Sequence, residues 1–154
     1  MESTTKHQWQ VSEVKLSYHP KVKVTMLPKV TSSSDTAAIL RQVWDQDLLE
    51  LVEQFKVMLL NRANRVLGIV DLSTGGMAGT VADPKLIFIA ALKGAATSII
   101  IAHNHPSGSL MHSHADKVLT DKLKAGGQLL DLQVLDHIIL TRDGYLSFAD
   151  EGMI

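Results

Sequence analysis

Hydrophobic and polar positions change their spacing along the chain, and each change predicts a secondary-structure element. Apolar residues from Ala37 to Trp44 recur at helical spacing after a run of capping residues at 32–35. This pattern predicts an amphipathic helix that ends near residues 45–47. Residues 56–60 and 65–72 are rich in apolar and β-branched side chains, and the turn formers between them predict a hairpin.

Helical and strand patterns alternate in the rest of the chain. Asp83 and Pro84 are an N-cap residue and a first-turn proline, which predict a helix that ends before Gly94. The later predictions are a buried strand at 97–102, a helix from residue 113 or 114 through 124, a buried strand at 132–140, and a turn with a short strand at 142–152. Together they predict an α/β domain with α-β-α layers, and the hairpin makes its sheet mixed.

The first 34 residues have a different pattern. Apolar and polar residues alternate at 11–19 and 21–27, with Pro20 and Pro28 between and after them, which predicts short, half-buried strands. The chain of 154 residues has the length of one domain. We therefore expect an N-terminal extension with short strands at 1–34 and one domain at 35–154.

Composition excludes several classes of function. There are 15 Lys and Arg residues against 16 Asp and Glu residues, a net charge of −1, so we do not expect nucleic acid to bind directly. The chain contains no cysteine, so a bound metal must be held by His, Asp or Glu. Apolar stretches are shorter than the ~18 residues of a membrane span, and no signal core opens the chain, which predicts a cytoplasmic protein without membrane contact.

Histidines gather after the strand predicted at 97–102. His103 and His105 are two residues apart, so in an extended segment both side chains point the same way. Asp116 follows in the first turn of the next predicted helix. Two imidazoles and one carboxylate form a three-ligand set, which leaves the fourth position of a zinc ion for water. This set lies beyond the carboxyl end of a buried strand, where reactive groups gather in α/β sheets.

Other roles explain single members of this group. Asp116 is also an acid at a helix start, and Ser113 is also a plain N-cap. A zinc hydrolase further needs an acid/base group, and Glu53 is a candidate by position, although spacing alone does not select it over Glu50. We expect His112 and His114 to be surface residues and His137 to be buried and hydrogen-bonded.

The spacing of these residues resembles a known motif. The chain matches the JAMM (MPN-plus) metalloprotease motif. One residue separates His103 from His105, seven residues separate His105 from Ser113, and two residues separate Ser113 from Asp116. The strings AHNHPSG, LDHIIL and GYLSFADEG are similar to the RadC family, a bacterial branch of that superfamily. The resemblance extends from about Thr36 to Ile154.

This resemblance implies a fold, a cofactor and roles for individual residues. The fold is the JAMM/MPN (cytidine-deaminase-like) architecture. His103, His105 and Asp116 bind one zinc ion per chain, and Ser113 stabilises the oxyanion of the reaction. EQFKVMLLN resembles the family segment with a glutamate before the first hairpin strand, which gives Glu53 the acid/base role.

Two functions follow from the resemblance and both stay open at this point. The first is a zinc-dependent metallohydrolase that cleaves peptide or isopeptide amide bonds in a peptide or protein substrate. The second is a non-catalytic zinc-containing module associated with DNA repair or DNA-processing partners. Full-length family members carry an N-terminal helix-hairpin-helix region that binds DNA, and no such helical pair is visible before Ser32. The sequence does not predict the oligomeric state.

Overall fold

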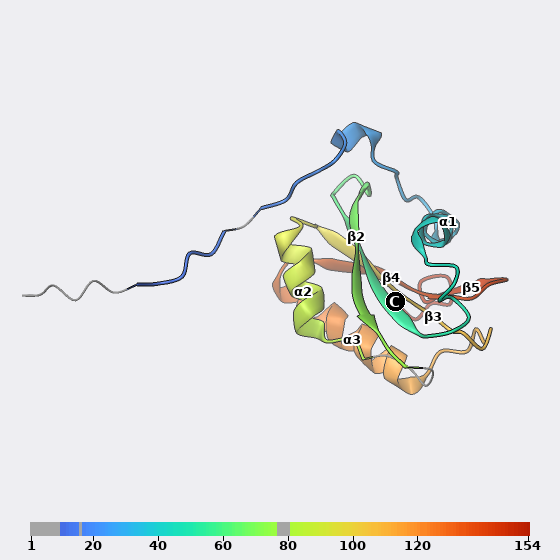
Figure 1. Cartoon of the computed structure of the whole chain (residues 1–154). Helices are drawn as coiled ribbons and strands as arrows, with labels where there is room; N and C mark the ends of the chain where they lie inside the picture. The colour runs from blue at the N-terminus through green and yellow to red at the C-terminus, as the bar shows by residue number, and fades with distance from the viewer. Residues whose placement is uncertain (1–9, 16, 77–80) are drawn as a thin grey trace, which may run out of the picture.

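The computed structural model describes residues 10–15, 17–76 and 81–154, and its centre is a five-stranded sheet with helices on both faces (Figure 1). Its helices and strands are α1 (Ser33–Val43), β1 (Gln54–Leu60), β2 (Val66–Thr74), α2 (Pro84–Lys93), β3 (Ser98–Asn104), α3 (His114–Leu129), β4 (Gln133–Leu140) and β5 (Tyr145–Ser147). The predicted α/β class with α-β-α layers is confirmed.

The sheet is mixed, as the sequence predicts. Its strand order is β2-β1-β3-β4-β5. β1 pairs antiparallel with both β2 and β3, β3 pairs parallel with β4, and β4 pairs antiparallel with β5. Every residue of β1 and of β3 is buried, so β3, which carries the predicted ligand His103 near its end, is a central strand.

The two faces of the sheet have separate cores. α1 packs on one face, where Leu40 lies in a cluster with Ile100 and Ala102 of β3. α2 and α3 cover the other face, where Leu123 lies in a cluster with Ile99 and Ile101. Side chains of a strand alternate between faces. His103 therefore continues the series that faces α2 and α3, and Asn104 continues the series that faces α1.

α1 begins where the capping residues predict and ends slightly earlier than expected. The Ser32 side chain accepts a hydrogen bond from the backbone N–H of Asp35, so Ser32 is the N-cap among the capping residues predicted at 32–35. The helix ends at Val43, because the next residue, Trp44, is already extended at φ −75° and ψ 132° and is buried in the core. A turn-rich segment then leads to β1.

The short strands predicted in the N-terminal extension do not form in its described residues. Before α1, residues 10–15 and 17–32 hold a 3-10 turn at Val24–Met26 and a single bridge from Lys29 to Arg65. A strand needs a pairing edge and a covered face, whereas Val11 and Val14 are 89% and 85% exposed.

Within the parts of the chain that the structure describes, no helix is both long and apolar enough to cross a bilayer.

Candidate metal centre

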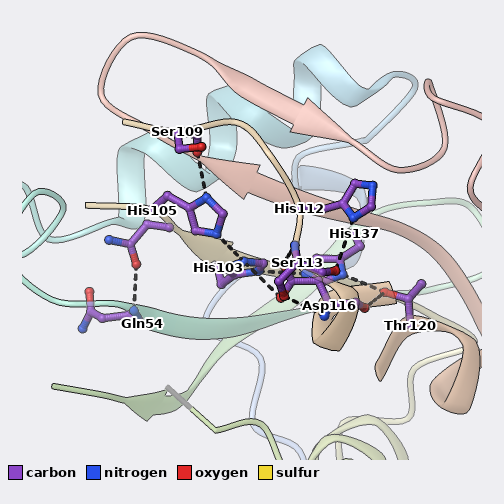
Figure 2. Close-up of polar contacts among 10 residues, drawn as sticks. Gln54, His103, His105, Ser109, His112, Ser113, Asp116, Thr120 and His137 are labelled. Carbon is purple, nitrogen blue, oxygen red and sulfur yellow. Dashed lines mark hydrogen bonds and ion pairs between the residues drawn. The ribbon is translucent and has the colours of Figure 1, made fainter. Parts of the chain in front are cut away.

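The three ligands predicted from the sequence converge in the structure (Figure 2). His103 Nε2 lies 3.0 Å from His105 Nε2 and 3.5 Å from Asp116 Oδ1. One donor atom from each of the three residues lies within 4.8 Å of the others. The histidines come from the end of β3 and the residue after it, and the carboxylate comes from the first turn of α3. The two elements thus present two nitrogens and one oxygen to a common point.

The start of α3 fixes the carboxylate through a capping box. Ser113 Oγ accepts a hydrogen bond from the backbone N–H of Asp116 at 3.1 Å, and Asp116 Oδ2 accepts one from the backbone N–H of Ser113 at 2.7 Å. Asp116 Oδ1 is the oxygen near His103. The capping role and the ligand position therefore coexist, because each uses a different oxygen of Asp116.

A tight turn after β3 orients the second histidine. The backbone N–H of Gly108 donates to the carbonyl of His105 at 3.0 Å, and Gly108 has φ +81°, a conformation that favours glycine. His105 Nδ1 donates to the carbonyl of Ser109 at 2.7 Å. Because a carbonyl only accepts, His105 carries a ring proton on Nδ1, and its other nitrogen, Nε2, is the one that faces His103.

Burial keeps the first histidine neutral. Only 1% of the His103 surface is exposed, and burial lowers its pKa to about 4. The opposite ring nitrogen, Nδ1, lies 2.8 Å from Nε2 of His137. Neutral imidazole nitrogens and a carboxylate oxygen are the donor types that zinc takes in proteins. The chemistry and convergence of these donors fit a divalent cation.

The structure distinguishes the two glutamates that spacing alone left equal. Glu53 is half-buried just before β1, and its carboxyl interacts electrostatically with His105 and Asp116. Burial is the main cause that raises the pKa of Glu53. The neighbouring His105 lowers this pKa, and the charge of Asp116 raises it. Glu50 instead is exposed and forms an ion pair with Arg142. Glu53 is therefore the glutamate that stands beside the candidate ligands.

Asn104 fixes the backbone on both sides of Glu53. Its side chain is fully buried on the sheet face opposite the histidines. Oδ1 accepts a hydrogen bond from the backbone N–H of Gln54 at 2.7 Å, while Nδ2 donates to the carbonyls of Leu49 and Val52 at 2.7 and 2.9 Å. The alternation of side chains along β3 accounts for the face on which Asn104 lies, but no local sequence pattern identifies these partners.

Comparison with known proteins identifies the family. The family profile described as "RadC-like JAB domain" matches residues 30–153. The chain belongs to this family. A UPF0758 protein of Flavobacterium johnsoniae is 44% identical over 131 residues, which cover 84% of this chain and 56% of the relative. A UPF0758 protein of Staphylococcus haemolyticus is 40% identical over 124 residues, or 80% of this chain and 53% of the relative.

The chain spans about half the length of these curated relatives. A UPF0758 protein of Porphyromonas gingivalis follows the same pattern, with 42% identity over 66% of this chain and 45% of the relative. The names of the relatives state no activity. The match therefore assigns the family and the fold of the RadC-like domain, and its chemistry has to be argued from the site.

The remaining histidines of the RadC-like domain lie where the sequence predicts. His112 and His114 are exposed, and the His112 ring packs edge-on against Phe148 with centroids 5.3 Å apart. His137 is fully buried in β4, and its Nδ1 lies 2.8 Å from Thr120 Oγ1. Thr120 is a functional candidate that the sequence reading missed. Its position four residues after Asp116, on the same helix face, is the signal that points to it.

Proposed function

We propose that the RadC-like domain is a zinc-dependent metallohydrolase that cleaves amide bonds in peptides or isopeptides. The observation that carries the proposal is the convergence of His103, His105 and Asp116 beside the half-buried carboxyl of Glu53. These three residues would hold one zinc ion per chain. Bound zinc supplies Lewis acidity and lowers the pKa of a coordinated water to about 7.

Glu53 has the environment that an acid/base group needs. Burial raises its pKa above the ordinary value of a glutamate, which is the direction that favours a general acid and base. In the proposed reaction it takes a proton from the attacking water and gives it to the departing amine. Asn104 holds the backbone around Glu53, so the carboxylate is offered from a fixed segment of the chain.

Ser113 stands at the exposed start of α3. Its oxygen accepts from the backbone of Asp116, so the hydroxyl proton remains for donation to another group. We assign that proton to the oxygen of the substrate carbonyl as negative charge develops on it. The N-terminus of α3 favours negative charge at the same place.

The proposal is tested by cleavage assays on the zinc-loaded protein. A library of peptides and isopeptide-linked peptides should yield cleavage that a chelator abolishes and added zinc restores. Glu53→Gln should retain zinc, because Glu53 is not a ligand, and should lose about 10²–10⁴-fold in turnover. Glu50→Gln is the matched control, since Glu50 is exposed and paired with Arg142, and it should cleave at the parental rate.

Two results would contradict the proposal. Parental turnover by Glu53→Gln would remove that residue from the chemistry. Absence of cleavage by zinc-loaded parent across the library would favour the second candidate, a non-catalytic zinc-containing module that acts through DNA repair or DNA-processing partners.

A further inference from the structure

α2 presents apolar side chains on two opposite sides. Its inner side packs on the sheet, where Ile87 and Ala91 are fully buried. Its outer side carries Leu86, Ile89 and Leu92, which recur at every third position and are 49%, 58% and 55% exposed. A helix that is apolar all round is normally covered on all sides. In the described part of the chain, nothing covers the outer side of α2.

α3 continues this apolar side. The two helices lie next to each other on one face of the sheet (Figure 1), and Phe88 of α2 reaches Gly126 of α3, where a Cβ atom would come within 2.9 Å of the ring. Val118 and Leu129 lie on the same stripe of α3 as Gly126 and are exposed. We refer to the exposed apolar residues of the two helices as the outer surface; its members are Leu86, Ile89, Leu92, Val118 and Leu129.

Lysines border the outer surface, and acids do not offset them. Lys85 and Lys93 of α2 and Lys122 of α3 are exposed, and none of them forms an ion pair with a described residue. α2 contains no Asp or Glu. The two nearest acids in the sequence are engaged, because Asp83 caps the start of α2 and Asp121 pairs with another lysine of α3. The outer surface is therefore locally positive, although the net charge of the chain is −1.

This combination of apolar and positive groups limits what can cover the outer surface. A second copy that packed through the same surface would bring lysines against lysines, which costs free energy. A bilayer is a poorer fit, because the apolar side chains of α2 are already about half covered, α2 is anchored to the sheet, and the outer surface has no aromatic side chain. An amphipathic helix with acidic flanks places apolar side chains on the apolar stripe and carboxylates opposite the lysines.

We propose that the outer surface binds an amphipathic, acidic helix of a partner protein. Leu86, Ile89 and Leu92 form the apolar centre of this contact. Lys85 and Lys93 set the orientation of the bound helix through ion pairs at the edge. This contact goes beyond the proposed hydrolysis and does not depend on it, because none of these side chains belongs to the candidate metal centre.

The test is a ¹H–¹⁵N NMR titration of the full chain with a designed helical peptide of about 20 residues. The peptide has leucines along one face and glutamates on both flanks, and a matched peptide has lysines in place of the glutamates. The glutamate peptide should bind at least about 10-fold more tightly, and its affinity should fall as salt is raised, because the charges at the edge are exposed. The amide signals that move should be those of α2 and α3.

Substitutions separate the apolar stripe from the lysines. Ile89→Glu should weaken binding of the glutamate peptide at least about 10-fold. Leu51→Glu, which adds the same charge at a similarly exposed residue in the turn after α1, should bind as the parent. Lys85→Glu combined with Lys93→Glu should reverse the preference and favour the lysine peptide. This double change leaves every apolar contact in place, so it tests the role of the lysines even if Ile89→Glu failed to fold.

Three results would overturn this proposal. The first is equal affinity for the two peptides, or no binding of either at about 1 mM peptide. The second is binding to phosphatidylglycerol vesicles without binding of the glutamate peptide, which would assign the outer surface to a membrane. The third is self-association in sedimentation that Ile89→Glu abolishes, without binding of the glutamate peptide, which would assign the surface to a second copy. Failure to bind zinc or to cleave would remove the proposed function and leave these results unchanged.

Discussion

The segment 103–105 uses its two sides for different purposes. On the α2/α3 side, His103 and His105 present ring nitrogens to the candidate metal centre, and the opposite nitrogen of each ring contacts another group, His137 or the carbonyl of Ser109. On the α1 side, Asn104 bonds only to backbone atoms of the segment that carries Glu53. The histidine side thus supplies nitrogen atoms to the candidate metal centre, whereas the Asn104 side holds the segment that carries the Glu53 carboxylate.

This difference shows how a short strand end can organise a whole site. Because successive side chains of an extended segment alternate, three consecutive residues reach two opposite layers at once. The two candidate histidine ligands and the segment that carries Glu53 are therefore positioned by the same short stretch of backbone, residues 103–105. A change on one side should affect metal binding, and a change on the other should affect turnover.

The largest expected effect is the loss of metal from the histidine side. His103→Ala and Asp116→Ala each delete one of the three proposed ligands and should reduce zinc affinity by more than about 100-fold. Asn104→Ala should keep about one zinc per chain. Elemental analysis of purified proteins measures the difference. Stoichiometric zinc in His103→Ala would break the comparison, as would its loss from Asn104→Ala.

Local sequence rules predicted much of the ligand side. The two-residue spacing of His103 and His105 sets a common direction in any extended segment, and the capping pattern before α3 places Asp116 in a first helical turn. What the sequence did not supply was the partner of each side chain. Pairing of His103 with His137 depends on the parallel register of β3 and β4, in which His103 lies opposite Ile139, and no local pattern encodes that register.

The opposite side illustrates the same limit more strongly. Asn104 binds backbone atoms about 50 residues earlier in the chain, which it meets through the β1–β3 pairing and the turn after α1.

In the N-terminal extension, a local pattern predicted strands that the described residues do not form. Alternation at 11–19 and 21–27 satisfies the strand rule, but alternation describes side-chain direction alone and does not provide a strand edge to pair with.

A smaller effect is expected from Asn104 itself. Asn104→Ala leaves the N–H of Gln54 and the carbonyls of Leu49 and Val52 without their partner, at a cost of about 1–3 kcal/mol for a buried polar group. The Glu53 segment loses its fixed position, so turnover should fall by at least about 10-fold although zinc is retained. Steady-state kinetics on a substrate from the cleavage screen measures the loss.

The control for Asn104→Ala must be at least as destabilised but leave the Glu53 segment intact. Leu60 lies at the far end of β1, and its side chain is fully buried. Leu60→Ala should therefore lower the free energy of unfolding by about 2–5 kcal/mol. At a temperature where both variants are folded, Leu60→Ala should turn over substrate at nearly the parental rate. An equal loss in both variants would mean that Asn104 acts through general stability.

The smallest expected effect concerns another buried polar group on the α1 side, Asp136 of β4. Its carboxylate accepts hydrogen bonds from the Ser147 hydroxyl at 2.5 Å and from the backbone N–H of Ala149 at 3.0 Å, but burial outweighs them and raises its pKa above the usual 3.8. An acid whose pKa is higher in the folded state stabilises the fold most below its unfolded pKa, and this contribution is lost as pH rises through the folded value.

Asp136→Asn keeps an oxygen acceptor and removes the titration. In urea unfolding of the zinc-free proteins, the stability of the parent relative to Asp136→Asn should therefore increase as pH is lowered from 7 toward 4. Zinc affinity and turnover should match the parent, since Asp136 contacts neither the candidate ligands nor the Glu53 segment. A relative stability that decreases in acid would show that the hydrogen bonds from Ser147 and Ala149 to the carboxylate dominate over its burial.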